Sequence, residues 1–138
     1  MRAFWLGVWM VAACGVLASQ CSAQGNVDLG AEFPLRVGGV AQVRNTDVTV
    51  RLERVDNDSR CPSGAQCIVA GDADVVVSLT RDATRREHTL HVSAEPRGAD
   101  DGAYRIELVS LAPTPSVDQP VRQSDYVARL RLTRAPGR

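Results

Sequence analysis

The chain of 138 residues contains no lysine, only two histidines, and no excess of either charge. All 16 basic residues are arginine, and 16 acidic residues balance them. The absence of lysine excludes Schiff-base chemistry and lysine nucleophiles. The balanced charge argues against nucleic-acid binding, which normally shows a basic excess or stripe. The length fits one domain and leaves no room for two ordinary ones.

Aromatic residues are also scarce, and half of them lie in an apolar N-terminal segment. Residues 3–18 carry no charge, follow Arg2, and lead into small residues that end at Ala23. This order is typical of a secretory signal peptide, so we expect residues 1–23 to be cleaved off. The alternative is a retained membrane anchor, but an apolar run of about 16 residues is short for a span of about 20.

Cys14 offers a second processing route. The sequence VAAC that ends at Cys14 resembles a lipobox, in which this cysteine is lipidated and becomes the N-terminus. Cleavage of the signal peptide leaves Cys61 and Cys67, an even number that can pair, whereas lipidation leaves Cys21 as an odd thiol. The even number of cysteines favours cleavage after Ala23, which gives a soluble protein without a lipid. By either route we expect export, to the periplasm or the extracellular space, or to a membrane as an anchored lipoprotein.

The rest of the chain alternates apolar and polar residues over short runs, with turn signals about every ten residues. Such alternation is typical of half-buried strands, and no segment has a convincing amphipathic helical spacing. The pattern predicts an all-β fold, a single antiparallel β-sandwich (Ig-like or Greek-key) of about seven strands. The expected strands span residues 33–37, 40–44, 48–55, 73–80, 87–93, 104–111 with a bulge, and 126–133.

These strands place a sandwich domain at residues 33–134, after an N-terminal linker at 24–32 and before a C-terminal tail at 135–138. Residues 94–102 contain proline, glycine and two aspartates, and we expect them to form a loop. Alternation along the strands predicts six inward-facing side chains, namely Phe33, Val50, Leu52, Val77, Leu108 and Leu130.

Two cysteines separated by five residues bracket the most informative loop. Pro62 and Gly64 lie between Cys61 and Cys67 and allow the chain to turn back. We expect a disulfide that anchors a crossover between strands, as is common in small secreted domains. A redox role is disfavoured because the spacing is not Cys-x-x-Cys, and two thiols are too few for a zinc site.

The same loop is the candidate binding surface, because loops on rigid scaffolds commonly carry function. The alternative is that its first residues only hold the loop in place, through an ion pair of Arg60 with Asp58 or Asp72. The candidate binding residues are Asp58, Ser59, Arg60, Pro62, Ser63, Gly64 and Gln66.

The stretch from Asp58 to Gly71 runs Asp-Ser-Arg-Cys-Pro-x-x-x-x-Cys-x-x-x-Gly. This pattern resembles a family of small bacterial exported proteins, many of them lipoproteins. The resemblance covers about residues 33–133 and departs at Val69, where relatives often carry tryptophan. The family has no established activity, so the resemblance implies export and adds no mechanism. The flanking matches are Phe33-Pro34-Leu35 with Gly38, Tyr104–Leu108, Leu111-Ala112-Pro113 and Tyr126–Leu130.

Metal ligands are not strongly indicated. His88 and His91 are three apart in an expected strand, so alternation places them on opposite faces and they do not share an ion. The acidic loop residues are favoured as turn formers, because aspartate and asparagine bond their own backbone. The alternative is a calcium site, since calcium binds loop carboxylates, although the spacing does not match the twelve-residue calcium loop. Its candidate ligands are Asp56, Asp58, Asp72 and Asp74.

No catalytic constellation or cofactor motif is evident in the sequence, and we expect no enzyme. We expect a non-enzymatic binding or structural module of the cell envelope, whose partner is an unknown protein or envelope component. Contact with a membrane is expected only through a lipid on Cys14, and contact with nucleic acid is not expected. The alternative is a protease inhibitor that presents Arg60 or Gln66 on the disulfide-closed 61–67 loop.

Overall fold

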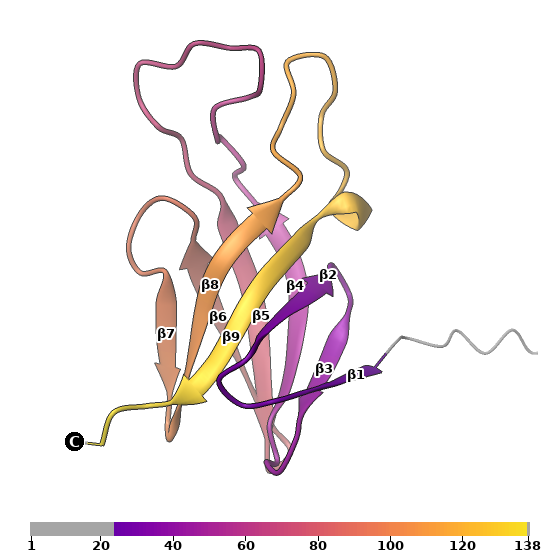
Figure 1. The fold of residues 1–138 in the computed structure, drawn as a ribbon, viewed down its shortest axis with the longest axis vertical. Helices are drawn as coiled ribbons and strands as arrows, with labels where there is room; N and C mark the ends of the chain where they lie inside the picture. Colours follow the sequence, from indigo (N-terminus) through magenta and orange to yellow (C-terminus); the bar gives the residue numbers. More distant parts are fainter. Residues whose placement is uncertain (1–23, 138) are drawn as a thin grey trace, which may run out of the picture.

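Nine strands and one short helix make up residues 24–137, the part of the chain that the computed structural model describes (Figure 1). The elements are β1 Gln24–Val27, β2 Glu32–Arg36, β3 Val40–Val43, β4 Thr49–Asp56, β5 Asp74–Arg81, β6 Thr84–His91, β7 Gly98–Asp101, β8 Tyr104–Ala112, the 3-10 helix η1 Gln123–Asp125, and β9 Val127–Arg134.

The strands form two sheets that pack face to face, which confirms the predicted all-β sandwich. One sheet has five strands in the order β1-β3-β4-β5-β6, and the other has four in the order β2-β9-β8-β7. The edge strands are therefore β1 and β6 in the first sheet and β2 and β7 in the second. Each of the seven expected strand positions holds a strand, and two further strands, β1 and β7, were not predicted.

The linker predicted at residues 24–32 instead contributes strand β1. Gln24 to Val27 pair with β3 in parallel register, so the sandwich is not purely antiparallel as predicted. The carbonyl of Val27 also accepts the N–H of Arg44 at 2.8 Å. Gln-Gly-Asn-Val has little strand character of its own, and pairing with β3 supplies the hydrogen bonds that make it a strand.

Residues 94–102 were predicted to form a loop, but four of them, Gly98–Asp101, form strand β7. Its sequence Gly-Ala-Asp-Asp is depleted in strand formers, yet all four residues pair antiparallel with β8. Strand β6 also begins earlier than predicted, at Thr84. The two residues of its turn, Asp82 and Ala83, have φ values of 46° and 61°. Because this turn has only two residues, Arg81 and Thr84 on either side of it pair directly, and β6 begins at Thr84.

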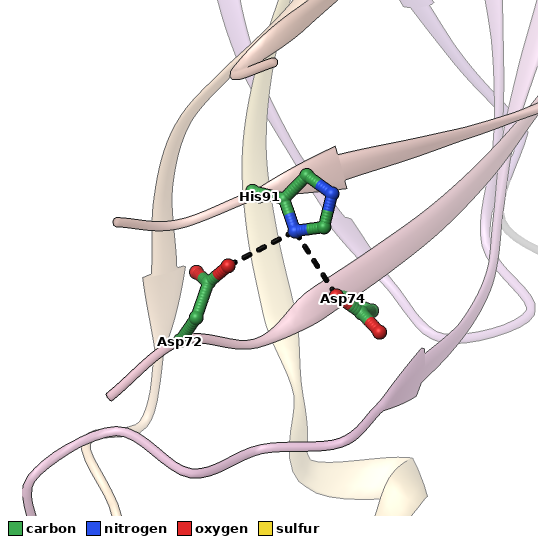
Figure 2. A group of neighbouring side chains, drawn as sticks. All are labelled: Asp72, Asp74 and His91. Carbon is green, nitrogen blue, oxygen red and sulfur yellow. Dashed lines mark hydrogen bonds and ion pairs between the residues drawn. The ribbon is translucent and has the colours of Figure 1, made fainter. Parts of the chain in front are cut away.

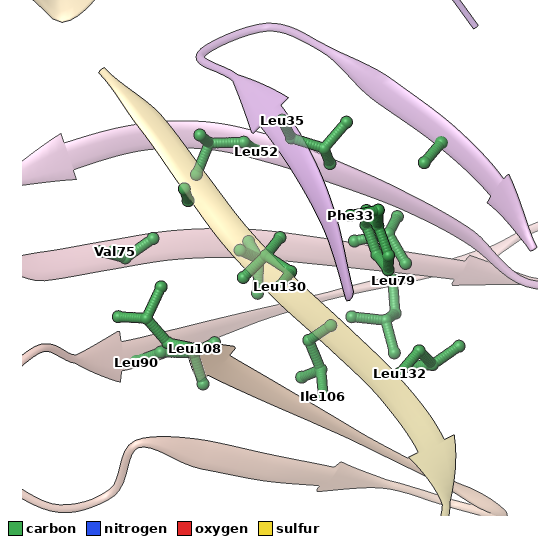
Figure 3. Close-up of a cluster of buried hydrophobic side chains, with 14 of the residues drawn as sticks. Phe33, Leu35, Leu52, Val75, Leu79, Leu90, Ile106, Leu108, Leu130 and Leu132 are labelled. Atoms are coloured by element: carbon green, nitrogen blue, oxygen red, sulfur yellow. The ribbon is translucent and has the colours of Figure 1, made fainter. Parts of the chain in front are cut away.

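The two sheets enclose a core of mostly aliphatic side chains, with Phe33 among them (Figure 3). All six residues predicted to face inward are buried, and Val50, Leu52, Val77 and Leu130 have no exposed surface. The predicted bulge lies in β8, where the register with β9 shifts between Leu108 and Ser110. Burial alternates with the period of two that the sequence indicated in β2, β3 and β9, whereas five consecutive residues of the central strand β5 are buried.

Candidate functional site

Two long loops project from one end of the sandwich (Figure 1). Residues 57–73 connect β4 to β5, and residues 113–126 connect β8 to β9 and include η1. The loops contact each other, because the Ser63 N–H donates to the Pro115 carbonyl at 2.8 Å. Ser63 also forms an isolated parallel bridge with Ser116. We call these two loops together the loop end.

The Cys61–Cys67 disulfide closes the first of these loops, as the sequence predicted. The two Cα atoms lie 5.9 Å apart, a separation common in protein disulfides. Between the cysteines, the Ala65 N–H donates to the Pro62 carbonyl at 3.2 Å, which forms a turn. Gly64 has a φ of 87°, a left-handed conformation that glycine adopts without strain.

The Arg60 side chain points inward and ties the first loop to the end of β8. Its Nε and Nη2 donate to the two carboxylate oxygens of Asp58 at 2.8 and 2.7 Å. Its Nη1 and Nη2 also donate to the carbonyl oxygens of Leu111 and Pro113, each at 2.8 Å. The Asp58 and Arg60 side chains are each only 10% exposed. This confirms the predicted Asp58–Arg60 ion pair.

Tyr126 completes this arrangement from the residue just before β9. Its Oη donates to Asp58 Oδ2 at 2.8 Å. Burial opposes ionisation of Asp58, but hydrogen bonds from Arg60 and Tyr126 outweigh it and hold the pKa of Asp58 below its usual value. Burial and the hydrogen bond to Asp58 raise the pKa of Tyr126 to about 12. At neutral pH the three groups therefore form a fixed structural clamp.

The end of the first loop returns close to its beginning at Gly71. The Ser59 N–H and Oγ both donate to the Asp72 carbonyl, at 2.7 and 3.1 Å. A Cβ atom at position 71 would lie 1.5 Å from the Ser59 carbonyl oxygen. Only glycine permits this close approach, which closes the base of the loop.

The seven candidate binding residues therefore divide into two groups. Asp58 and Arg60 are turned inward, and the Ser59 hydroxyl is bonded to the other stem of the loop. Ser63, Gly64 and Gln66 are exposed near the tip, beside the half-buried Pro62. The first group supports the loop, and only the second is placed to contact a partner.

Sequence reasoning missed the apolar side chains at the loop end. Ile68 and Val69 are 103% and 78% exposed, directly after Cys67, and Val117 on the second loop is 57% exposed. We call these three residues the apolar tip. The sequence signal for these exposed residues was an Ile-Val pair in an otherwise polar loop. It did not stand out, because similar apolar pairs occur in the predicted strands.

The four acidic residues of the calcium hypothesis do not come together as one site. Asp56 accepts a hydrogen bond from Arg54 at 2.7 Å, and the Asp58 carboxylate is held in the clamp. Asp72 and Asp74 instead meet His91, a residue that the calcium hypothesis did not include (Figure 2). The three side chains come from the start of β5 and the end of β6.

The two histidines lie on opposite faces of β6, as alternation predicted. His88 faces β7, where its Nε2 lies 3.4 Å from Asp101 Oδ2. Arg86, on the same face, also contacts Asp101 at 3.3 Å. His91 is on the other face, beside Asp72 and Asp74. The two histidines therefore belong to separate groups of charged residues.

The predicted signal peptide at residues 1–23 and the lipidation candidate Cys14 lie outside the residues that the structure describes. Among residues 24–137, no helix is long and apolar enough to cross a membrane.

No family model, curated protein or solved structure matches this chain. The resemblance to small exported bacterial proteins therefore remains a hypothesis that depends on the Asp58–Gly71 pattern and its flanks.

Proposed function

We propose that this protein is an exported, non-enzymatic binding module of the cell envelope, and that the loop end contacts a partner protein. The observation that carries the proposal is the apolar tip. Within residues 24–137, every large hydrophobic side chain that is strongly exposed belongs to it, namely Ile68, Val69 and Val117. Single exposed hydrophobic residues are ordinary, but their restriction to one end of a molecule marks an interaction site.

The burial of these side chains would favour association. Apolar surface removed from water contributes about 25 cal/mol per Å², and Ile68 is fully exposed while Val69 is 78% exposed. The first loop is also fixed before binding, by the disulfide and by the clamp of Asp58, Arg60 and Tyr126. A loop that is already ordered loses less conformational entropy when it binds.

The same features support an envelope location. Disulfides persist outside the cytoplasm, and Cys61–Cys67 agrees with the signal peptide expected at residues 1–23. A lipid on Cys14 would attach the domain to a membrane. The partner is an unknown protein or envelope component, and the balanced charge of the chain argues against nucleic acid.

A protease inhibitor is the second candidate, and the disulfide-closed loop favours it. The Arg60 guanidinium makes four side-chain hydrogen bonds and is 10% exposed, so it is not offered to a protease. The inhibitor hypothesis therefore depends on Gln66, which is exposed at the tip of the loop.

Site-specific photo-cross-linking in the bacterial envelope tests the binding proposal. A photoreactive residue at Val69 should give a discrete cross-linked product, and Ile68→Ser in the same chain should reduce it. Thr84, exposed in the turn region at the opposite end, is the matched control position and should give none. Equal products from both positions, or no product from Val69, would contradict the proposal.

The inhibitor alternative has its own measurement. Purified protein is titrated against trypsin-like and subtilisin-like proteases. Stoichiometric inhibition that Gln66→Ala abolishes would favour an inhibitor. Unchanged protease activity would contradict the inhibitor hypothesis and favour the binding module.

A further inference from the structure

Asp72, Asp74 and His91 converge at the base of the loop end (Figure 2). Asp74 begins β5 and His91 ends β6, where they are direct register partners, and Asp72 lies just before β5. His91 Nδ1 is 2.9 Å from Asp72 Oδ2 and 3.0 Å from Asp74 Oδ1. Each residue thus offers one ligand atom, and the three atoms lie within 4.8 Å of one another.

Neighbouring groups orient both carboxylates and leave one oxygen of each facing the imidazole. Asp72 Oδ1 accepts the N–H groups of Val92 and Ser93 at 2.9 and 2.8 Å. Asp74 Oδ2 accepts a hydrogen bond from Asn57 Nδ2 at 2.7 Å. The remaining oxygens, Asp72 Oδ2 and Asp74 Oδ1, meet the same ring nitrogen. Outer hydrogen bonds of this kind typically hold carboxylates that bind metals.

Hydrogen bonding alone does not satisfy this group well. One imidazole nitrogen carries at most one proton, so His91 Nδ1 serves both carboxylates only by sharing that proton between them. A divalent cation at the same place accepts the nitrogen lone pair and binds both oxygens. It also neutralises two carboxylates that otherwise repel each other.

We propose that Asp72, Asp74 and His91 bind a divalent transition-metal ion, and that Zn²⁺ fits them best. Zinc takes imidazole nitrogen and carboxylate oxygen at about 2.0–2.2 Å. In a tetrahedral site, bonds of that length place neighbouring ligand atoms about 3.4 Å apart, so the two nitrogen–oxygen distances of 2.9 and 3.0 Å widen by a few tenths of an ångström when the ion binds. The three side chains are 25–27% exposed, so water completes the coordination. Calcium and magnesium prefer sets of oxygen ligands without imidazole.

Asp56 lies beside this site without belonging to it. It is the register partner of Asp74 on β4, which places both carboxylates on one face of the sheet. Arg54 Nε donates to Asp56 Oδ2 at 2.7 Å and engages that carboxylate. The ligand set is therefore one nitrogen and two oxygens, with an additional ion pair at its edge.

A metal ion here would connect both stems of the first loop to β6. Asp72 and Asp74 belong to the returning stem, and Asn57, which orients Asp74, belongs to the outgoing stem. The ion would cross-link the two stems at the base of the loop. Because it binds only the folded chain, it would stabilise that chain by mass action. This inference stands apart from the proposed partner, because the apolar tip takes no part in the site.

Titration with Zn²⁺ tests the inference. Protein purified from the envelope of an expressing bacterium is freed of metal with a chelator and titrated by isothermal calorimetry. We expect one saturable site per chain and a higher thermal midpoint with Zn²⁺ than without it. His91→Gln should weaken binding more than tenfold, because it removes the one nitrogen ligand. Asn57→Ala should weaken it about tenfold, because it releases Asp74.

His88→Gln is the matched control, since it removes the other histidine of the chain and leaves the site intact. Its affinity for Zn²⁺ should equal that of the unmodified protein. The inference fails if the unmodified protein shows no saturable binding, if His91→Gln binds equally well, or if Ca²⁺ competes on equal terms. Circular dichroism checks folding, and if His91→Gln does not fold, Asp74→Asn and Asn57→Ala decide the outcome.

Discussion

Tyr126 Oη and Asp58 Oδ2 lie 2.8 Å apart, although 68 positions of sequence separate the two residues. Asp58 follows β4 of the five-stranded sheet, and Tyr126 precedes β9 of the four-stranded sheet. Their hydrogen bond therefore joins the two sheets at the loop end. Arg60, paired with the same carboxylate, continues the connection to the end of β8.

Removal of either partner should lower the free energy of unfolding, by different amounts. Tyr126→Phe should cost about 1.5 kcal/mol, because it deletes one hydrogen bond to a charged group. Asp58→Asn should cost about 3 kcal/mol, because the Arg60 guanidinium then lacks a counter-charge. Urea denaturation measures both. Tyr104→Phe is the control, since the Tyr104 hydroxyl makes no side-chain hydrogen bond within residues 24–137, and an equal loss there would contradict the assignment.

Alkaline pH should weaken the same hydrogen bond. The folded pKa of Tyr126 is about 12, above the ordinary value of about 10. A raised pKa means that folding favours the protonated phenol, so its contribution is full below pH 10 and disappears as the pH rises to about 12. The stability difference between the unmodified protein and Tyr126→Phe should shrink over that interval. A difference that stays constant from pH 9 to about 12 would refute this.

The disulfide should contribute stability rather than chemistry. Replacement of Cys61 and Cys67 by serine should lower the free energy of unfolding by about 2 kcal/mol, the chain-entropy value for so short a loop. Thermal or urea unfolding of the two forms gives the difference. Reactive thiols at these positions in the native oxidised protein, or ready reduction at about −270 mV, would instead favour a redox role.

Gly71→Ala should disrupt the base of the first loop. The added Cβ would lie 1.5 Å from the Ser59 carbonyl oxygen, so the backbone must shift, at a cost of about 2 kcal/mol or more. Gly25→Ala is the matched control, because nothing lies within 4 Å of its added Cβ. Urea denaturation should give a lower free energy of unfolding for Gly71→Ala than for Gly25→Ala. Equal values would show that the backbone at the loop base adapts to the added Cβ without cost.

The exported protein should begin at Gln24 and carry no lipid. This follows from the cleavage site expected after Ala23 and from the even number of cysteines that remains. Intact mass spectrometry of protein from the envelope measures the N-terminus directly. A glyceryl-modified Cys14 would show instead that the domain is anchored to a membrane.

The strand pattern of the sandwich was predictable because burial follows local alternation. Phe33, Val50 and Leu130 face the core for reasons visible within a few neighbouring residues. Strands β1 and β7 were missed because their residues have low strand propensity and owe their conformation to β3 and β8. Such pairing depends on the fold and leaves little trace in a short segment.

The candidate site was predictable in part. Asp58, Arg60 and the two cysteines lie close in sequence, so their pairing could be predicted from spacing. The third member of the clamp, Tyr126, precedes β9, and the third member of the proposed metal site, His91, ends β6, so both are distant in sequence from their partners. Their partners become apparent only when the register of the sheets brings them together.

The four edge strands each carry a feature that discourages further strand pairing. β1 and β7 are four residues long, β2 contains Pro34, and β6 carries Arg85, Arg86 and Glu87 along its exposed half. Short, proline-bearing and charged edges are the means by which sheets avoid joining into fibrils. The sandwich can therefore reach high concentration without its sheets joining edge to edge.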